Sequence, residues 1–352
     1  MFGRKKTSLL GLDISSSMIR LLEIGQKKGR YTVVSYAAEA LPNDVVIDSK
    51  VVDKEEVVRA IKHAIKRASI KLKDIVIALP TETAIIGRLS VPKGLSEREI
   101  EEQVKQDAES HIPYPMDEVM LDFEVIGPSE DDDEMNEVLL VASQSEYIDM
   151  LTDIVEDAGL TLKSIDISAF AIENAYHLIA QNLPNHGQGL TTAIVDIGAN
   201  TTTLHVLVDG KSVFSREHAF GGRALTEEIA QQYGMSYQEA ENAKKENSFS
   251  QGYEAELLEP FKQAMTTTVT RALQFFFSAS TQYKSIDYII LAGGCATIDG
   301  VAEMIEENTD TPTIVANPFA NMNIEPKVKK TSLVDDAPAL LAACGLALRG
   351  VD

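Results

Sequence analysis

Leu10-Gly-Leu-Asp-Ile-Ser-Ser-Ser17 is the stretch that decides the expected fold, because Ile194-Val-Asp-Ile-Gly-Ala-Asn-Thr-Thr-Thr203 repeats its pattern. Each is a run of strand-forming residues that ends in an aspartate and continues into serine, threonine, asparagine and glycine. The two aspartates, Asp13 and Asp196, lie 183 residues apart. A strand that delivers a carboxylate to its tip, followed by hydroxyls and free backbone N–H groups, suits the Mg²⁺ and phosphates of a nucleotide. Two copies of this segment indicate a site that clamps the nucleotide between them.

The sequence around each aspartate follows one plan. Residues 8–39 alternate apolar and polar side chains as three consecutive strands, and residues 194–218 repeat this alternation. Each set is followed by helical periodicity and then by a short apolar strand, which is Ile75–Leu79 in the first half and Tyr288–Ala292 in the second. This order predicts duplicated α/β lobes that face each other.

Both halves contain an insertion. Residues 85–165 read as a small α+β module, with a helix that starts at the capping box Ser96-Glu-Arg-Glu99 and stops at Ile112-Pro-Tyr-Pro115. The acidic run Glu130–Glu134 lacks the ligand spacing of a calcium loop, so we expect a solvated hairpin tip. Residues 235–258 form a second, smaller insertion.

Composition excludes several classes of function. The net charge of −22 provides no basic field for nucleic acid or for an anionic membrane. The two cysteines, Cys295 and Cys344, make neither a disulfide scaffold nor a zinc motif. No stretch reaches the roughly 18 apolar residues of a spanning helix, and Ser8–Ile14 is too short for a signal sequence. We therefore expect a cytoplasmic protein.

Four further motifs extend the pattern. They are Phe220-Gly-Gly-Arg223, Ala240-Glu-Asn-Ala-Lys244, Ile290-Leu-Ala-Gly-Gly-Cys-Ala296 and Ala342-Ala-Cys-Gly-Leu-Ala347. Together with the two aspartate segments, in this order and at this spacing, they resemble the actin-like ATPase superfamily, which also contains the Hsp70 nucleotide-binding domain and the sugar kinases. The resemblance covers essentially the whole chain and implies duplicated ribonuclease-H-like lobes.

Within that superfamily the chain is similar to the PilM family of type IV pilus assembly proteins, which is itself related to the division protein FtsA. The similarity rests on Gly11–Met18, the module placed after Ala78-Leu-Pro80, the stop at Ile112–Pro115, and Asp166–Ala175. FtsA ends in an amphipathic membrane-binding helix. The chain stops at Asp352 without one, so we expect no direct membrane insertion and favour an FtsA-like division protein only as a third alternative.

The resemblance implies four subdomains. Subdomain 1A is expected at 1–84 and 166–190, and the inserted module of the SHS2 type, subdomain 1C, at 85–165. Subdomain 2A is expected at 191–234 and 259–352, and subdomain 2B at 235–258.

The same resemblance implies an ATP·Mg²⁺ site between the lobes. Asp13 and Asp196 would hold the hydrated Mg²⁺, since this ion keeps several waters and takes few carboxylates. The β- and γ-phosphates would be bound by hydroxyls and backbone N–H groups of Ser15, Ser16, Ser17, Gly198, Asn200, Thr201 and Thr202.

The adenosine would lie against the second lobe. Gly221 and Gly222 open the next helix where an alanine side chain would obstruct the nucleotide, and Glu241 and Lys244 match the AExxK pattern that reaches the ribose and base. The backbone that lies flat against adenosine is assigned to Gly293, Gly294 and Cys295.

The chain departs from the superfamily's pattern at a position that affects ATP hydrolysis. Members that hydrolyse ATP quickly carry a glutamate or glutamine at the start of the helix after the module, where it positions the attacking water. Ser168 stands there in this chain, with Asp166 two residues earlier. Nucleotide binding is therefore better supported than turnover, and an ATPase or small-molecule kinase is the alternative from another class.

We expect an ATP-binding scaffold of the type IV pilus inner-membrane platform, the machinery of twitching motility. The family implies one specific partner, the short cytoplasmic N-terminal peptide of the inner-membrane protein PilN, bound between the first core subdomain and the 85–165 module. It also implies recruitment to the inner membrane through partners, contact with other pilus and motor proteins, and allows self-association.

Overall fold

The computed structural model describes residues 8–27, 29–129, 132–246, 249, 252–280 and 282–351. The charged N-terminal residues 1–6 lie outside these ranges, and so do parts of the acidic run at 130–134 and of the smaller insertion at 235–258. Within them, no helix combines the length and apolar character needed to span a bilayer.

The first lobe is built on a six-stranded sheet in the order β10-β6-β1-β2-β3-β16. Its strands are β1 (Leu10–Ile14), β2 (Met18–Lys27), β3 (Arg30–Ala40), β6 (Asp74–Leu79), β10 (Thr161–Ile167) and β16 (Asn323–Ile324). Its other elements are the hairpin of β4 (Val46–Ile47) and β5 (Lys50–Val51), and the helices α1 (Lys54–Ala68), α3 (Ser145–Asp157), α4 (Ser168–Ala180) and α10 (Leu341–Leu348).

The second lobe repeats this arrangement with a five-stranded sheet in the order β13-β12-β11-β14-β15. Its strands are β11 (Thr191–Ile197), β12 (Thr202–Val208), β13 (Lys211–His218), β14 (Tyr288–Ala292) and β15 (Thr313–Val315). Its helices are α5 (Arg223–Tyr233), α6 (Tyr237–Glu246), α7 (Glu259–Ala279), α8 (Val301–Thr309) and α9 (Lys330–Asp335). This order corresponds to β3-β2-β1-β6-β10, so the predicted duplication is confirmed.

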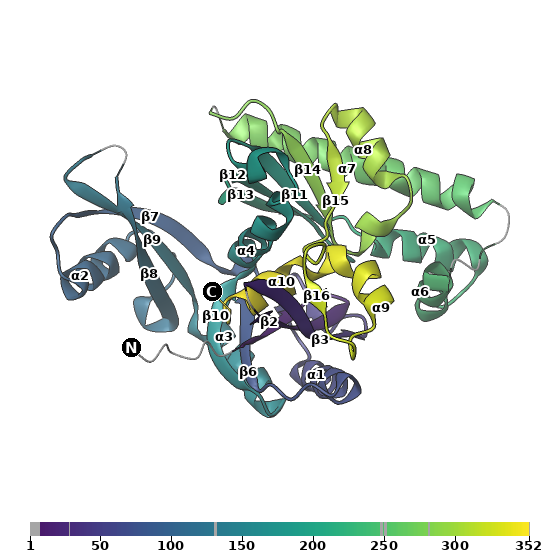
Figure 1. Ribbon diagram of the computed structural model, residues 1–352, viewed down its shortest axis with the longest axis horizontal. Coiled ribbons are helices and arrows are strands. Elements are labelled where there is room, and N and C mark those ends of the chain that lie inside the picture. The colour runs from purple at the N-terminus through teal and green to yellow at the C-terminus, as the bar shows by residue number, and fades with distance from the viewer. Residues whose placement is uncertain are drawn as a thin grey trace.

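The inserted module projects from the first lobe, at the left of Figure 1. Strands β7 (Ile85–Pro92), β9 (Met135–Gln144) and β8 (Val119–Pro128) form its sheet in that order, and α2 (Glu97–Ala108) packs on one face. The capping box at the start of α2 is confirmed, since the Ser96 N–H donates to Glu99 Oε2 at 2.8 Å and Ser96 Oγ accepts from the Glu99 N–H.

The expected end of the module at residue 165 requires correction. Strand β10 pairs in parallel with β6 inside the first-lobe sheet, and α3 buries Leu151, Ile154 and Val155 in the core of that lobe. The module sheet therefore ends at Gln144, and residues 145–165 belong to the first lobe. The residue pattern alone did not show which sheet β10 joins.

Helices α4 and α10 cross between the lobes (Figure 1), and small residues let them approach. A Cβ on Gly345 of α10 would lie 1.6 Å from the carbonyl oxygen of Ala171 in α4. A Cβ on Gly11 of β1 would lie 2.3 Å from the carbonyl oxygen of Ala343. One continuous core joins side chains of both sheets through these two helices, which makes their crossing the mechanical connection between the lobes.

His205 on β12 is buried, and its Nδ1 has no hydrogen-bond partner among the described residues. Burial lowers the pKa of His205 to about 4 from its ordinary value of 6.5. Because the folded chain binds this proton less readily than the unfolded chain, His205 lowers stability as the pH falls from 6.5 to about 4. The cost is about 1.4 kcal/mol for each pH unit in that window.

We expect His205→Leu to be at least as stable as the parent chain at pH 7.5, because it removes an unsatisfied buried polar atom. At pH 4.5 its advantage should grow by on the order of 2 kcal/mol. Urea unfolding of both proteins at the two pH values measures this. An equal pH dependence for the two proteins would show that His205 does not titrate as described.

Candidate functional site

The loop after β1 is a tight turn that presents serines. The backbone N–H of Ser15 and its Oγ both donate to the carbonyl oxygen of Met18, at 2.9 and 3.1 Å. This arrangement closes the turn and leaves Ser16 and Ser17 partly exposed at its tip. The Ser15 hydroxyl is thus partly used in holding the turn, whereas the next two hydroxyls are available to a ligand.

Arg20 completes this half of the site and was missed by the sequence analysis. It lies on β2 directly opposite Asp13. One nitrogen, Nη1, donates to Asp13 Oδ2 at 3.1 Å and to Ser15 Oγ at 3.1 Å. The hairpin register could have identified Arg20 from the sequence, because a tight turn after Asp13 brings residue 20 back beside it. A guanidinium at this position supplies a positive charge suited to phosphate oxygens.

Asp196 provides the carboxylate of the second lobe, near the end of β11. Burial raises its pKa to about 6; the Arg20 guanidinium acts in the opposite direction, and the Asp13 carboxylate adds to the rise. Burial also raises the pKa of Asp13, against the effect of Arg20. Asp196 therefore lies close enough to Asp13 and Arg20 for their charges to affect its ionisation, although the two aspartates come from different lobes.

The loop after Asp196 is held by backbone hydrogen bonds. The Gly198 N–H donates to the carbonyl oxygen of Thr201 at 2.9 Å, which leaves Asn200 and Thr201 partly exposed at the tip. Thr202 differs, because its buried hydroxyl donates to the carbonyl oxygen of Phe220 at 2.8 Å. Its hydroxyl ties two loops together, and the expected contact between that hydroxyl and phosphate is withdrawn.

The glycine pair before α5 is required by backbone packing. A Cβ on Gly221 would lie 2.4 Å from the carbonyl oxygen of Ala199, and one on Gly222 would lie 2.7 Å from Cys295 Sγ. The Gly222 N–H donates to the carbonyl oxygen of Gly198 at 3.0 Å. These glycines fix the loop of Asp196 against α5. We expected glycine at these two positions because a larger side chain would obstruct the nucleotide. Close backbone packing is a further reason.

Glu241 and Lys244 lie together on α6, as the AExxK pattern predicts. Lys244 Nζ lies 2.7 Å from Glu241 Oε2 and donates to Thr226 Oγ1 at 2.6 Å, while Thr226 Oγ1 donates to the same glutamate oxygen at 2.8 Å. Lys244 and Glu241 also influence the pKa of Cys295, so α6 borders the same space as the Asp196 loop. The contact of this ion pair with a nucleotide stays a prediction.

The second glycine pair lies against β11. Gly293 has a φ of +81°, and a Cβ there would lie 2.3 Å from the carbonyl oxygen of Ile197 and 2.5 Å from Asp196 Oδ1. Gly294 has open space where a Cβ would be, so a ligand can approach its backbone. Burial raises the pKa of the neighbouring Cys295 to about 11, which keeps this thiol neutral.

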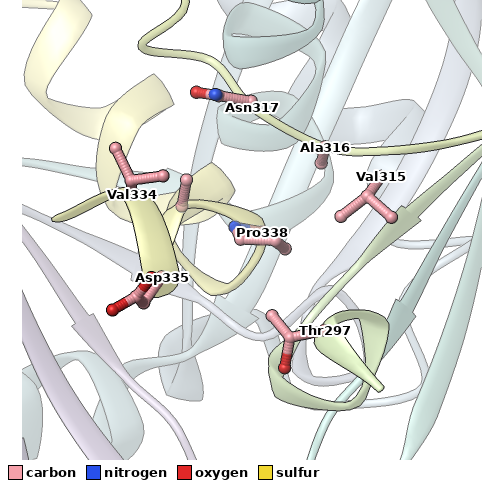
Figure 2. A pocket seen from close by; sticks show the side chains of 8 residues that line it. Thr297, Val315, Ala316, Asn317, Val334, Asp335 and Pro338 are labelled. Atoms are coloured by element: carbon pink, nitrogen blue, oxygen red, sulfur yellow. The ribbon is translucent and has the colours of Figure 1, made fainter. Parts of the chain in front are cut away.

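A pocket of about 520 Å³ adjoins this glycine pair. The Gly293 N–H donates to the carbonyl oxygen of Pro338, one of its walls, at 2.9 Å. Val315, Val334 and Pro338 give it apolar surface; in Figure 2, Asp335 and Thr297 lie on one side of Pro338 and Asn317 on the other. Apolar walls with a few polar groups are typical of organic ligand sites. No sequence motif marked this pocket.

Neither side chain at the expected water-positioning site is free. The hydroxyl of Ser168 accepts the Thr81 N–H at 3.1 Å and lies 2.9 Å from Thr81 Oγ1. Asp166 is buried and forms an ion pair with Arg349 at the end of α10. The start of α4 therefore carries no glutamate or glutamine at the position expected to orient the attacking water.

The donor set fits Mg²⁺ better than a transition metal. Among the described residues, no group of three or more histidine, cysteine, aspartate and glutamate side chains is arranged to hold a metal ion. The carboxylates of Asp13 and Asp196 suit a hydrated Mg²⁺, which takes few protein carboxylates and keeps several waters.

Comparison with known proteins decides the family. The family model described as "Type IV pilus assembly protein PilM" matches residues 11–351. The chain belongs to the PilM family. It is accordingly an actin-like protein of type IV pilus assembly.

Relatives agree with this assignment. The cell division protein FtsA of Enterococcus hirae is 21% identical over 343 residues, which cover 85% of this chain and 75% of FtsA. The structure of a PilM–PilN type IV pilus biogenesis complex contains a chain that is 25% identical, with a TM-score of 0.81 and 99% of both chains covered.

More distant structures share the fold alone. EutJ, the ethanolamine utilization protein of Carboxydothermus hydrogenoformans, is 18% identical, with a TM-score of 0.57 over 97% of this chain and 89% of EutJ. MreB5 of Spiroplasma citri, solved with ADP, is 15% identical, with a TM-score of 0.50 over 97% of this chain and 95% of MreB5.

Proposed function

We propose that this chain binds ATP·Mg²⁺ between its lobes. In the ATP-bound form it acts as a scaffold that holds the cytoplasmic N-terminal peptide of PilN. The observation that carries the proposal is the agreement over 99% of both chains with a chain of the PilM–PilN complex. Recruitment to the inner membrane follows from that partner, and contacts with motor proteins and other pilus proteins belong to the same proposal.

Nucleotide binding is supported by the convergence of both loops. Asp13 and Asp196 would hold the hydrated Mg²⁺, which would neutralise phosphate charge. Arg20 would exchange its bond with Asp13 for a phosphate oxygen, because the metal would then compensate the carboxylate. Ser16, Ser17, Asn200 and Thr201, together with the N–H groups of their loops, would complete the phosphate contacts.

The base is proposed to extend past Gly294 into the 520 Å³ pocket. Glu241 and Lys244 would contact the ribose from α6. The carboxylate of Asp335 would accept a hydrogen bond from an exocyclic amine, while Val315 and Pro338 would cover the ring. MreB5, which shares the fold, is solved with ADP, and this agrees with a nucleotide at such a site.

The peptide site is proposed on the inserted module, close to the first lobe. The face of its sheet opposite α2 exposes Ile86 and Met120, and Val141 on the same face packs against the first-lobe core. A short tail that becomes ordered in such a place binds through a few apolar anchors, at modest affinity.

Calorimetry with a synthetic N-terminal PilN peptide from the same organism tests this partner. We expect binding to the intact chain, loss of binding for Ile86→Asp, and no effect of Val213→Asp, a similarly exposed residue on β13. Each variant must also retain its melting shift with ATP, which shows that the lobes are folded. Equal binding by Ile86→Asp and the parent chain would place the peptide elsewhere.

A further inference from the structure

A run of basic residues without any acidic one covers most of α1 and the segment that follows it. Residues 57–73, here called the basic strip, contain six lysines and arginines, one histidine and no aspartate or glutamate. The whole chain, in contrast, has a net charge of −22. Helix α1 buries Val57, Ile61 and Ala64 on its inner side, so its basic side chains are directed to solvent. The basic strip is therefore a local reversal of the chain's overall charge.

Ion pairs neutralise only part of the basic strip. Arg59 pairs with Glu56, and Arg67 pairs with Glu39 of β3. Basic side chains in the last turn of α1 also offset its helix dipole. Among the described residues, however, four exposed lysines of the strip have no ion-pair partner: Lys62, Lys66, Lys71 and Lys73.

The N-terminal sequence adds positive charge beside the end of the strip. Strand β1 pairs in parallel with β6 through Leu10 and Ile75, so the chain enters the first lobe next to Lys73. The seven residues before Ser8 include Arg4, Lys5 and Lys6 and no acidic residue. Two separate parts of the sequence therefore bring positive charge to the same end of β1 and β6.

We propose that the basic strip binds an anionic lipid surface. The contact is peripheral: the lysines lie at the level of the lipid headgroups and no segment inserts into the bilayer. Clusters of lysine and arginine bind anionic bilayers in this way, because the leaflet surface has a negative potential. This activity goes beyond nucleotide and peptide binding and requires neither.

The shape of the strip favours a bilayer over an acidic peptide. Its lysines stand on the outer side of a helix and on the segment after it, and α1 lies at the lower edge of the first lobe in Figure 1. A peptide is usually held in a groove or on a sheet edge, by pockets that receive its anchors. A bilayer presents a broad layer of negative charge and needs only an outward-facing surface.

The net charge of −22 does not prevent this contact. It led us to expect no attraction to an anionic membrane, but it averages over surfaces that lie far apart. Salt screens exposed charges beyond about 8 Å at physiological ionic strength, so the surface next to the bilayer decides the attraction. The acidic inserted module projects to the left in Figure 1, apart from α1, so the strip can face a bilayer while the module does not.

Co-sedimentation with lipid vesicles, without nucleotide or peptide, tests the contact. The strip variant is Lys62→Gln/Lys66→Gln/Lys71→Gln, and Lys62→Arg/Lys66→Arg/Lys71→Arg keeps the charge at the same positions. A control of equal charge change is Lys211→Gln/Lys284→Gln/Lys327→Gln, at exposed lysines outside the strip. The vesicles contain either about 30% phosphatidylglycerol or phosphatidylcholine alone. All proteins are run at about 50 mM and about 500 mM NaCl, because salt screens the attraction.

We expect the parent chain to sediment with the phosphatidylglycerol vesicles at low salt, to leave them at high salt, and to ignore phosphatidylcholine. The strip variant should bind roughly 100-fold more weakly, since each lysine near an anionic surface contributes about fivefold. The arginine variant and the control should bind like the parent. Equal melting temperatures show that the variants are folded, and the salt and lipid dependence of the parent tests the proposal without any variant.

Three results would overturn the proposal. The first is a parent chain that stays in solution with phosphatidylglycerol vesicles at low salt, which would leave an acidic protein as the partner of the strip. The second is a strip variant that binds these vesicles as tightly as the parent. The third is a control variant that loses as much binding as the strip variant, because the attraction would then not be local to α1 and the segment after it.

Discussion

Asp13→Ala and Asp196→Ala should each remove most of the melting shift that ATP·Mg²⁺ produces in the parent chain. A ligand that binds only the folded state adds about 2.7 kcal/mol of stability at 100 times its dissociation constant, so the parent shift should be readily measured. Each variant loses one of two carboxylates that face the same space. One remaining carboxylate leaves the metal with half of its protein ligands.

The stability of the nucleotide-free protein should respond differently. The folded-state pKa of Asp196 is about 6, above its ordinary value, so its ionised form opposes folding at neutral pH. Asp196→Ala should therefore leave the melting temperature without ATP unchanged or slightly raised. Asp149→Ala, at an exposed aspartate of α3, is the control and should keep the full shift. If Asp13→Ala and Asp196→Ala both keep the full ATP-induced melting shift, nucleotide does not bind between these loops.

Gly345→Ala should destabilise the protein by about 3 kcal/mol or more. In an exposed helix the same change stabilises by about 1 kcal/mol, because alanine is the better helix former. Here the added Cβ would lie 1.6 Å from a backbone oxygen of α4, so the two helices must separate. Both lobes pack on these helices, and the loss therefore extends across the shared core.

Gly87→Ala provides the matched control for that change. Its Cβ would meet only the end of Leu140, at 3.9 Å, so its stability should stay within about 0.5 kcal/mol of the parent. Urea unfolding of the three proteins gives the comparison. A Gly345→Ala protein as stable as the parent would mean that α4 and α10 do not cross as closely as described.

The repeated strand pattern was sufficient to predict both lobes, because strand alternation and turn chemistry are local properties. Strand β14 was predicted at Tyr288–Ala292, as observed. The end of the module was wrong because partner choice for β10 depends on long-range pairing, which leaves no periodic signal.

Sequence motifs mark part of the candidate site, and the role of these residues in nucleotide binding stays a prediction. Asp13, Asp196 and the two glycine pairs came from local patterns, and the structure places them together. Arg20 required the hairpin register, and Asp335 required the arrangement of α9 beside the second lobe. The Thr202 hydroxyl donates to the carbonyl oxygen of Phe220. This contact joins two loops, and the spacing of residues in the sequence does not predict it.

Single-turnover hydrolysis of ATP by the purified chain distinguishes a scaffold that holds nucleotide from an enzyme that consumes it. The hydroxyl of Ser168 is engaged by Thr81 and is too short to position water, while Asp166 is paired with Arg349. Positioning supplies much of the rate in phosphoryl transfer. We predict a rate on the order of 10⁻³ per second or less with Mg²⁺ and no partner. A rate near the enzyme median of roughly 10 per second would contradict the scaffold account and support an ATPase.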